Sequence, residues 1–245
     1  MDILLDTTVQ IERIFKQKRK RAIEKIISDN NCGSSTYVLG EFKNNIVKDF
    51  VTLYNIMQIE KDLAGVRDKI NDDVFSDRSF KRVYYIFNDL CKMYQDDYDL
   101  IKEELRTYPE RLERRFSYGL KSPLLNETDC HRAKARIEFA DSKADIPGVN
   151  CSKKDDFCAS CEFWEKYKEY IVGLEDESGL QDKMKTALVK LRDGQETLKG
   201  RVCKNLGDCI ISLEALQTTD KKVCTTNIGD FKPICDYIGV KLCEL

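Results

Sequence analysis

The stretch VCTTNIGDFKPICDYIGV, residues 223–240, gives the clearest indication of the fold. It opens within a short apolar run, KKVCTTN, that predicts a buried strand, and its later half, FKPICDYIG, has the spacing of a helix. Pro233 is expected in the first turn of that helix and Gly239 at its end, where these residues are favoured. Asp230 lies between the two elements. A strand that leads directly into a helix indicates an α/β fold with parallel strands.

In three other segments one acid lies near the end of a predicted strand or the start of a predicted helix. These are DILLDTTV (residues 2–9) with Asp6, SSTYVLGEFKNN (34–45) with Glu41, and GDCIISLEA (207–215) with Asp208. The first reads as a strand that ends at its acid, and the other two place their acids early in helices. Ligand sites in open α/β sheets lie outside the carboxyl ends of the strands. We therefore expect all four acids to face one edge of the sheet.

Convergent carboxylates match the chemistry of phosphodiester hydrolysis with divalent metals. Mg²⁺ and Mn²⁺ prefer oxygen ligands and keep some of their waters, so three or four acids from different elements suffice. Each acid also has an ordinary explanation. Asp6, Asp208 and Asp230 are possible helix N-caps, and Glu41 is a possible solvated helix residue.

In this order and with these flanks, the four segments resemble PIN domains, a family of metal-dependent nucleases. The most distinctive parts are the closing T-T-N-x-x-D-F motif, residues 225–231, and the G-D-x-x-I helix that starts at Gly207. Glu41 and Asp208 stand much farther apart here than the matching acids do in compact members of the family. This separation indicates a large insertion.

The resemblance implies a PIN-like parallel-sheet sandwich with a metal site. Asp6, Glu41 and Asp208 are expected to bind Mg²⁺ or Mn²⁺, and Asp230 is expected to join them as a catalytic residue. Supporting roles at the site are expected for three polar neighbours, Thr7, Thr226 and Asn227.

The middle of the chain has a helical pattern instead. The first helix is expected to run to about Ser28. Apolar residues then recur at alternating steps of three and four from Ile56 through Ile59 to Ile70, and a longer heptad-like stripe runs from Phe80 to Leu105. The later stripe predicts a long antiparallel helical hairpin. We therefore expect a nuclease core from residues 1–50 and 200–245, with 51–199 as a mostly helical insertion.

Cysteines within about residues 129–162 form a second motif. Cys151, Cys158 and Cys161 have the spacing of zinc ligands, with Cys130 or His131 as the fourth. An iron–sulfur cluster and ordinary thiols are the alternatives. The cysteines outside this segment, Cys203 among them, are expected to be small core residues.

Basic residues beside this segment predict a phosphate-binding surface, with a solvated helix face as the alternative. The candidate contacts are Arg132, Lys134, Arg136, Lys153 and Lys154. Because the net charge is −2, any nucleic acid must be held by local patches.

No apolar run has the roughly 20 residues of a membrane span, and no secretory signal is evident. We expect a soluble, cytoplasmic protein whose 11 cysteines are kept reduced.

The leading functional hypothesis is a Mg²⁺- or Mn²⁺-dependent ribonuclease of the PIN type. RNA is the substrate that the resemblance implies, and the toxin-like members of the family also imply an inhibitory or recruiting protein partner. The alternatives are a non-catalytic scaffold that binds RNA or protein through the hairpin and zinc segment, and a structure-specific DNA nuclease. The sequence does not specify the oligomeric state.

Overall fold

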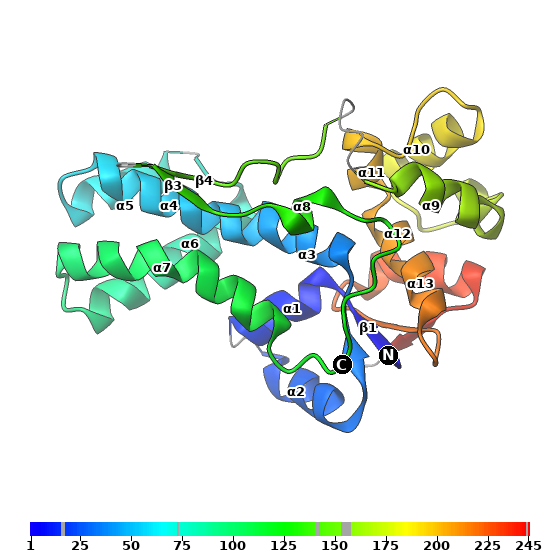
Figure 1. Cartoon of the computed structure of the whole chain (residues 1–245), viewed down its shortest axis with the longest axis horizontal. Coiled ribbons are helices and arrows are strands. Elements are labelled where there is room, and N and C mark those ends of the chain that lie inside the picture. Colours follow the sequence, from blue (N-terminus) through cyan, green and yellow to red (C-terminus); the bar gives the residue numbers. More distant parts are fainter. Residues whose placement is uncertain (16–17, 73, 141–142, 153–157, 244) are drawn as a thin grey trace. The chain divides into compact units, whose positions relative to one another are not determined.

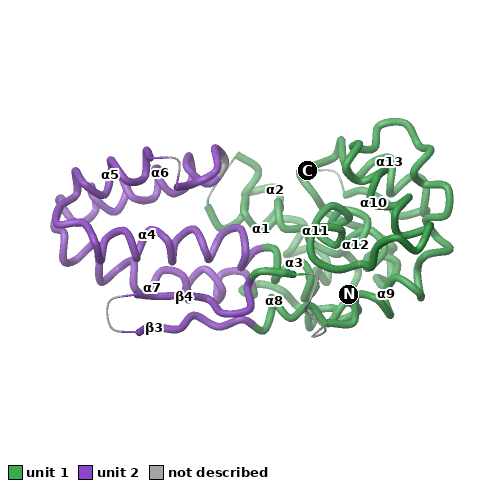
Figure 2. The backbone as a smooth tube through the Cα atoms, turned by 90° about the horizontal axis from the view of Figure 1, so that it is seen from above, with its two compact units in different colours: residues 1–41, 117–134, 150–245 green, residues 42–116, 135–149 purple. Residues whose placement is uncertain are grey.

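The structure is a computed structural model that describes residues 1–245 apart from 16–17, 73, 141–142, 153–157 and 244 (Figure 1). It confirms the expected α/β class, because its helices accompany a four-stranded parallel sheet. It divides into two compact units (Figure 2). Unit 1 contains residues 1–41, 117–134 and 150–245, and unit 2 contains residues 42–116 and 135–149.

The parallel sheet belongs to unit 1 and has the strand order β2-β1-β5-β6. Its strands are β1 (Ile3–Leu5), β2 (Cys32–Gly33), β5 (Lys222–Cys224) and β6 (Lys241–Cys243). In the centre, Leu4 of β1 pairs with Gly33 on one side and Val223 on the other. Strands from both ends of the chain therefore build one sheet, and their carboxyl ends share one edge.

Apolar burial explains why β1 is central. Leu4 and Leu5 are completely buried, as expected for a short apolar run covered on both faces. One cluster of buried side chains joins this strand to the two helices that follow it and to neighbouring strands: Ile3, Leu5, Val9, Ile23, Ile27, Cys32 and Cys224.

Helices connect these strands in unit 1. In chain order they are α1 (Thr7–Ile14), α2 (Lys20–Asp29), α3 (Thr36–Phe42, whose last residue belongs to unit 2), α8 (His131–Lys134), α9 (Ser160–Tyr167), α10 (Asp182–Arg192), α11 (Gly200–Asn205), α12 (Gly207–Glu214) and α13 (Ile228–Ile238). Short 3₁₀ turns span Lys168–Ile171, Leu174–Asp176 and Ala215–Gln217. Helices α12 and α13 pack against each other (Figure 1).

Some sequence expectations about these helices were wrong. The first helix does not run unbroken to Ser28: α1 ends at Ile14, and α2 begins at Lys20. Helix α13 begins at Ile228, so Pro233 lies in its second turn rather than its first. Gly239 does end this helix, with a φ of 76° that suits glycine.

Unit 2 is built mainly from helices. They are α4 (Lys48–Ile59, preceded by a π-helical turn, Lys43–Val47), α5 (Leu63–Asn71), α6 (Asp77–Met93) and α7 (Tyr98–Ser117), accompanied by the antiparallel pair β3 (Glu138–Ala140) and β4 (Lys143–Asp145). A turn at residues 94–97 joins α6 to α7 and interrupts the stripe from Phe80 to Leu105. Ile59 is 77% exposed, so it does not belong to an apolar stripe.

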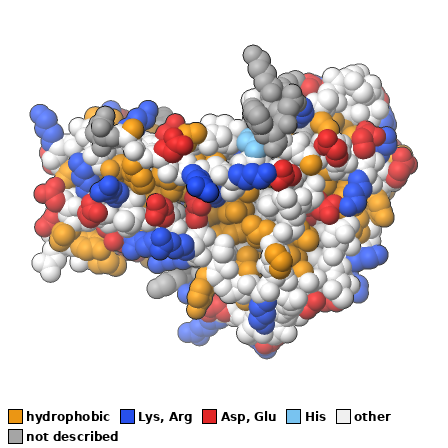
Figure 3. All heavy atoms as spheres, viewed as in Figure 1, with side chains coloured by type: hydrophobic (Ala, Val, Ile, Leu, Met, Phe, Trp, Pro, Cys, Tyr) orange, Lys and Arg blue, Asp and Glu red, His pale blue; other side chains and the backbone are white. Residues whose placement is uncertain are grey.

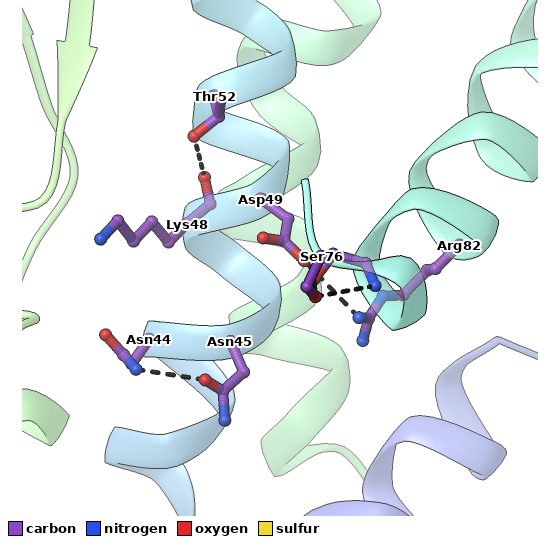
Figure 4. Close-up of polar contacts among 8 residues, drawn as sticks. Asn44, Asn45, Lys48, Asp49, Thr52, Ser76 and Arg82 are labelled. Carbon is purple, nitrogen blue, oxygen red and sulfur yellow. Dashed lines mark hydrogen bonds and ion pairs between the residues drawn. The ribbon is translucent and has the colours of Figure 1, made fainter. Parts of the chain in front are cut away.

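Specific contacts fix the helices of unit 2. Asp49 on α4 faces Arg82 on α6 at 3.5 Å (Figure 4), and both side chains are largely shielded from water. The ring of Phe50 on α4 lies 4.9 Å from that of Tyr108 on α7. The amine of Lys43 pairs with Glu113 of α7 at 2.9 Å.

The units do not follow the expected division of the chain. Residues 117–134 and 150–199 group with the two chain ends, and residues 42–50 group with the helical unit. Acidic and basic side chains are interspersed over the face shown in Figure 3. Among the helices of the described residues, we find none with the length and apolar character that crossing a bilayer requires.

Two leucines of α7 give a matched test of the packing in unit 2. Leu105 is completely buried, whereas Leu100 is 52% exposed. Leu105→Ala should lower the free energy of unfolding by about 2–5 kcal/mol, since it leaves a cavity. Leu100→Ala should change it by less than about 0.5 kcal/mol. Urea unfolding followed by circular dichroism measures both values, and equal losses would contradict the packing described here.

Candidate carboxylate site

Asp6 lies directly after β1 and serves two purposes. It is the N-cap of α1, accepting hydrogen bonds from the backbone N–H groups of Thr7 at 2.5 Å and Thr8 at 3.3 Å. Its Oδ2 also accepts from the hydroxyls of Thr8 at 2.7 Å and Thr225 at 2.9 Å. Burial raises the pKa of Asp6, and these hydrogen bonds oppose the rise. The N-cap explanation is therefore true, but it does not account for the whole environment of this acid.

Glu41 reaches the same region from α3. Ser35 begins this helix by accepting a hydrogen bond from the N–H of Val38 at 3.2 Å, as expected for a cap. The hydroxyl of Thr7 donates to Oε2 of Glu41 at 2.8 Å, so neighbouring residues hold Asp6 and Glu41. Burial, followed by repulsion from Asp6, raises the pKa of Glu41.

Asp208 lies in the first turn of α12. A Cβ atom at Gly207 would lie only 3.0 Å from Oε1 of Glu41, so glycine allows this helix to come close to α3. Burial and then repulsion from Asp6, Glu41 and Asp230 raise the pKa of Asp208 to about 7. All four predicted acids therefore belong to one electrostatic cluster.

Asp230 lies in the first turn of α13, not ahead of it, so it is not the N-cap. Asn227 precedes this helix and donates from its side-chain amide to Oδ2 of Asp230 at 2.7 Å. The backbone N–H of Thr226 donates to the hydroxyl of Thr8 at 3.0 Å. The hydroxyls that hold Asp6 come from Thr8 and Thr225.

The donor set of this cluster consists of oxygen atoms, the ligands that Mg²⁺ and Mn²⁺ prefer. A cation would also relieve the mutual repulsion that raises the pKa of Asp208. As the side chains are placed, however, no three Asp, Glu, His or Cys residues of the described chain form a group ready to hold a metal ion. The acids fit a divalent cation in chemistry and in location, and binding would require their carboxylates to reorient.

The cysteines of the second motif also belong to unit 1. Cys151 forms a hydrogen bond with Cys203 of α11, which lowers the pKa of Cys151 to about 6. Cys130 is buried, Cys158 is half-buried and close enough to Cys130 to influence it, and Cys161 lies on α9. His131 contacts the carbonyl of Asn150 through Nε2 at 3.3 Å. Cys203 is buried, as expected for a small core residue, and it also influences the thiol of Cys151.

Arg132 was wrongly expected on a phosphate-binding surface. It is only 2% exposed, with Nε donating to Sγ of Cys130 at 3.3 Å and its guanidinium 5.0 Å from the ring centroid of Tyr37. Its charge acts on Glu41 instead and opposes the rise in the pKa of that acid. Lys134 is exposed but pairs with Asp129 at 2.8 Å, and Arg136 is exposed in unit 2. Lys153 and Lys154 lie outside the described residues.

Sequence reasoning also missed Lys183 and Glu214. Lys183 is an exposed residue of α10 whose charge opposes the rise in the pKa of Asp208. No motif distinguishes it from the other lysines of the sequence. Glu214 is completely buried at the end of α12. Its position within an otherwise apolar helix could have identified it from the sequence.

No protein-family model, curated protein or solved structure matches this chain.

Glu214 makes stability depend on pH. Burial raises its pKa from 4.5 to about 8, and the neighbouring hydroxyls of Ser35 and Thr128 oppose the rise. Between these pH values the folded protein keeps a proton that the unfolded chain releases, so stability falls as pH rises through this window. Wild type should therefore lose stability more steeply than Glu214→Gln, by up to about 1.4 kcal/mol per pH unit.

Urea unfolding at pH 5 and pH 8.5 measures this difference. The exposed residue Glu169 provides the control, since Glu169→Gln should follow the wild-type pH dependence. If Glu214→Gln and wild type change in parallel with pH, the buried acid is already ionised in the folded protein.

Proposed function

We propose that this protein is a Mg²⁺- or Mn²⁺-dependent ribonuclease of the PIN type that hydrolyses RNA phosphodiester bonds. One observation supports this function above all others. Acids from four separate segments meet where parallel strands end, and they are close enough to shift one another's pKa values. Functional sites concentrate such perturbed groups, and open α/β sheets bind ligands at this edge.

Asp6, Glu41 and Asp208 are the residues that would hold the metal ion. When bound, such an ion lowers the pKa of a water molecule and neutralises charge on a phosphate group. Only oxygen donors are involved, which suits a hard cation. The preference for RNA over DNA rests on the resemblance of the sequence to PIN domains.

The neighbouring polar residues orient these acids. Thr7 holds one carboxylate oxygen of Glu41, and Thr8 and Thr225 hold one oxygen of Asp6. The other oxygen of Asp6, Oδ1, accepts from the backbone N–H of Thr7 at 2.5 Å. Residues that fix the first ligands of a metal commonly affect its affinity as well. Lys183 offers a positive charge near Asp208, where a phosphate group would approach.

Replacing the acids tests this function. Asp6→Asn and Asp208→Asn should each lower the rate of RNA cleavage in Mn²⁺ by more than about 100-fold, because loss of an outer partner alone costs 10–100-fold. The assay uses labelled single-stranded RNA, structured RNA and DNA with protein purified in parallel. Asp236→Asn on the exposed side of α13 is the matched control and should cleave like wild type.

Undiminished cleavage by both Asn variants would remove the carboxylate cluster from the mechanism. Cleavage of DNA but not RNA would retain the metal chemistry and overturn the ribonuclease assignment. Absence of cleavage in wild type, together with RNA binding, would favour a scaffold.

Two variants of Thr7 test whether its hydroxyl positions Glu41 for metal binding. Thr7→Val removes the hydroxyl that donates to Glu41, whereas Thr7→Ser keeps it. We expect Mn²⁺ to bind Thr7→Val about 10–100-fold more weakly than wild type. The serine variant should bind within a few-fold of wild type. Isothermal titration calorimetry measures both affinities, and equal affinities for the two variants would show that this hydrogen bond does not organise the site.

A further inference from the structure

Four basic side chains lie on two neighbouring helices of unit 1. Helices α10 and α11 are joined by residues 193–199 and contact each other, and they lie side by side in both views (Figures 1 and 2). Lys183 and Lys190 are exposed on one side of α10, and Arg201 and Lys204 are exposed on one side of α11. We refer to these four residues as the α10–α11 cations.

The charge of these side chains is not neutralised by neighbours. None of the α10–α11 cations forms an ion pair or a side-chain hydrogen bond within the described part of the chain. By contrast, Arg192 of the same helix α10 pairs with both Glu175 and Asp193. The segment 182–205 has seven Lys or Arg residues against three Asp or Glu residues, although the net charge of the whole chain is −2. It is therefore a local basic patch with charge available to a ligand.

Packing places this patch beside the carboxylate cluster. The thiol of Cys209 on α12 donates to Sδ of Met184 on α10 at 3.5 Å, so the residues that follow Asp208 and Lys183 are in contact. Lys204 lies shortly before Asp208 in the chain, on a helix that also contacts α12. Both basic helices therefore bring positive charge to the start of α12.

Phosphate groups are the ligands that such side chains favour. Exposed Lys and Arg residues bind the phosphates of a nucleic acid and fix its position without reading its sequence. Lys183 and Lys190 are separated by about 10 Å along their helix, at 1.5 Å per residue, so they can contact different phosphates of one strand. A strand that approaches several carboxylates is also repelled by them, and flanking cations offset that repulsion.

We propose that the α10–α11 cations bind the sugar–phosphate backbone of the substrate and lead it to the carboxylate cluster. Lys183 and Lys204 hold the phosphates nearest Asp208, and Lys190 and Arg201 hold those farther along the strand. That the strand is RNA rests on the proposed function, whereas the preference for phosphate follows from the charges themselves. Binding of this kind weakens as salt rises, because each phosphate contact releases counterions.

Binding of fluorescein-labelled oligouridine to the full chain tests this proposal. Fluorescence anisotropy in EDTA, where a metal-dependent nuclease does not cleave, gives the association constant between about 50 and 200 mM salt. Each phosphate contact to a single strand contributes about 0.7 to the steepness of the salt dependence. Replacing Lys183 and Lys204 by Gln should therefore reduce the steepness by about 1.4, and replacing all four cations by Gln should reduce it by about 2.8. Circular dichroism checks that each variant is folded.

Two other lysines provide the matched control. Lys221, just before β5, and Lys241, at the start of β6, are also exposed and form no ion pair within the described residues. They lie at the amino ends of these parallel strands, whereas the acids follow the carboxyl ends. Lys221→Gln/Lys241→Gln removes the same charge as the double variant above and should bind RNA like wild type.

Three results would overturn the proposal: no binding of oligouridine by wild type, wild-type affinity and salt dependence in the fourfold variant, or an equal loss in the control. Oligothymidine should lose affinity for the fourfold variant as oligouridine does, since both carry phosphates. A loss confined to RNA would contradict phosphate recognition.

Cleavage in Mn²⁺ is scored separately. RNA binding that depends on the α10–α11 cations, without any cleavage, would keep this inference and remove the proposed function. Cleavage that depends on Asp6, with unchanged binding by the fourfold variant, would do the reverse.

Discussion

Burial of three mutually repelling carboxylates, those of Asp6, Glu41 and Asp208, is the constraint on which the candidate site depends. Asp6 is 3% exposed, and burial is the largest influence on the pKa of each of Asp6, Glu41 and Asp208. Gathering such groups away from water costs stability unless protons, hydrogen bonds or cations compensate. The sheet imposes this arrangement, because β1 and β5 deliver the residues that follow them to one edge. A protein keeps such an arrangement most readily where function requires it.

The compensation comes from a few neighbours. Threonine hydroxyls hold Asp6 and Glu41, an amide holds Asp230, and the buried charge of Arg132 acts on Glu41. Arg132 also contacts Cys130 and influences Cys203, so one buried cation acts both on the acid cluster and on these thiols.

The sequence predicted those parts of the fold that rest on local patterns. The apolar runs before Asp6 and before Thr225 are strands, and the acids near Gly207 and Phe231 do lie at helix beginnings. Grouping the four acids was possible because strand ends and helix starts meet at a common sheet edge. Tertiary partners were not predictable in this way. Nothing local in HRAKAR tells a buried Arg132 from an exposed Lys134. The end of α1 at Ile14 was also missed, because apolar spacing continues through Ile23 and Ile26.

The coupling between the acids can be measured directly by NMR titration of the Asp208 side-chain carboxyl in metal-free protein. We expect a pKa of about 7 in wild type, a lower pKa in Asp6→Asn because one repelling charge is gone, and a lower pKa in wild type when Mg²⁺ is added. A pKa close to the ordinary value of about 3.9 that neither change affects would contradict the existence of a shared carboxylate site.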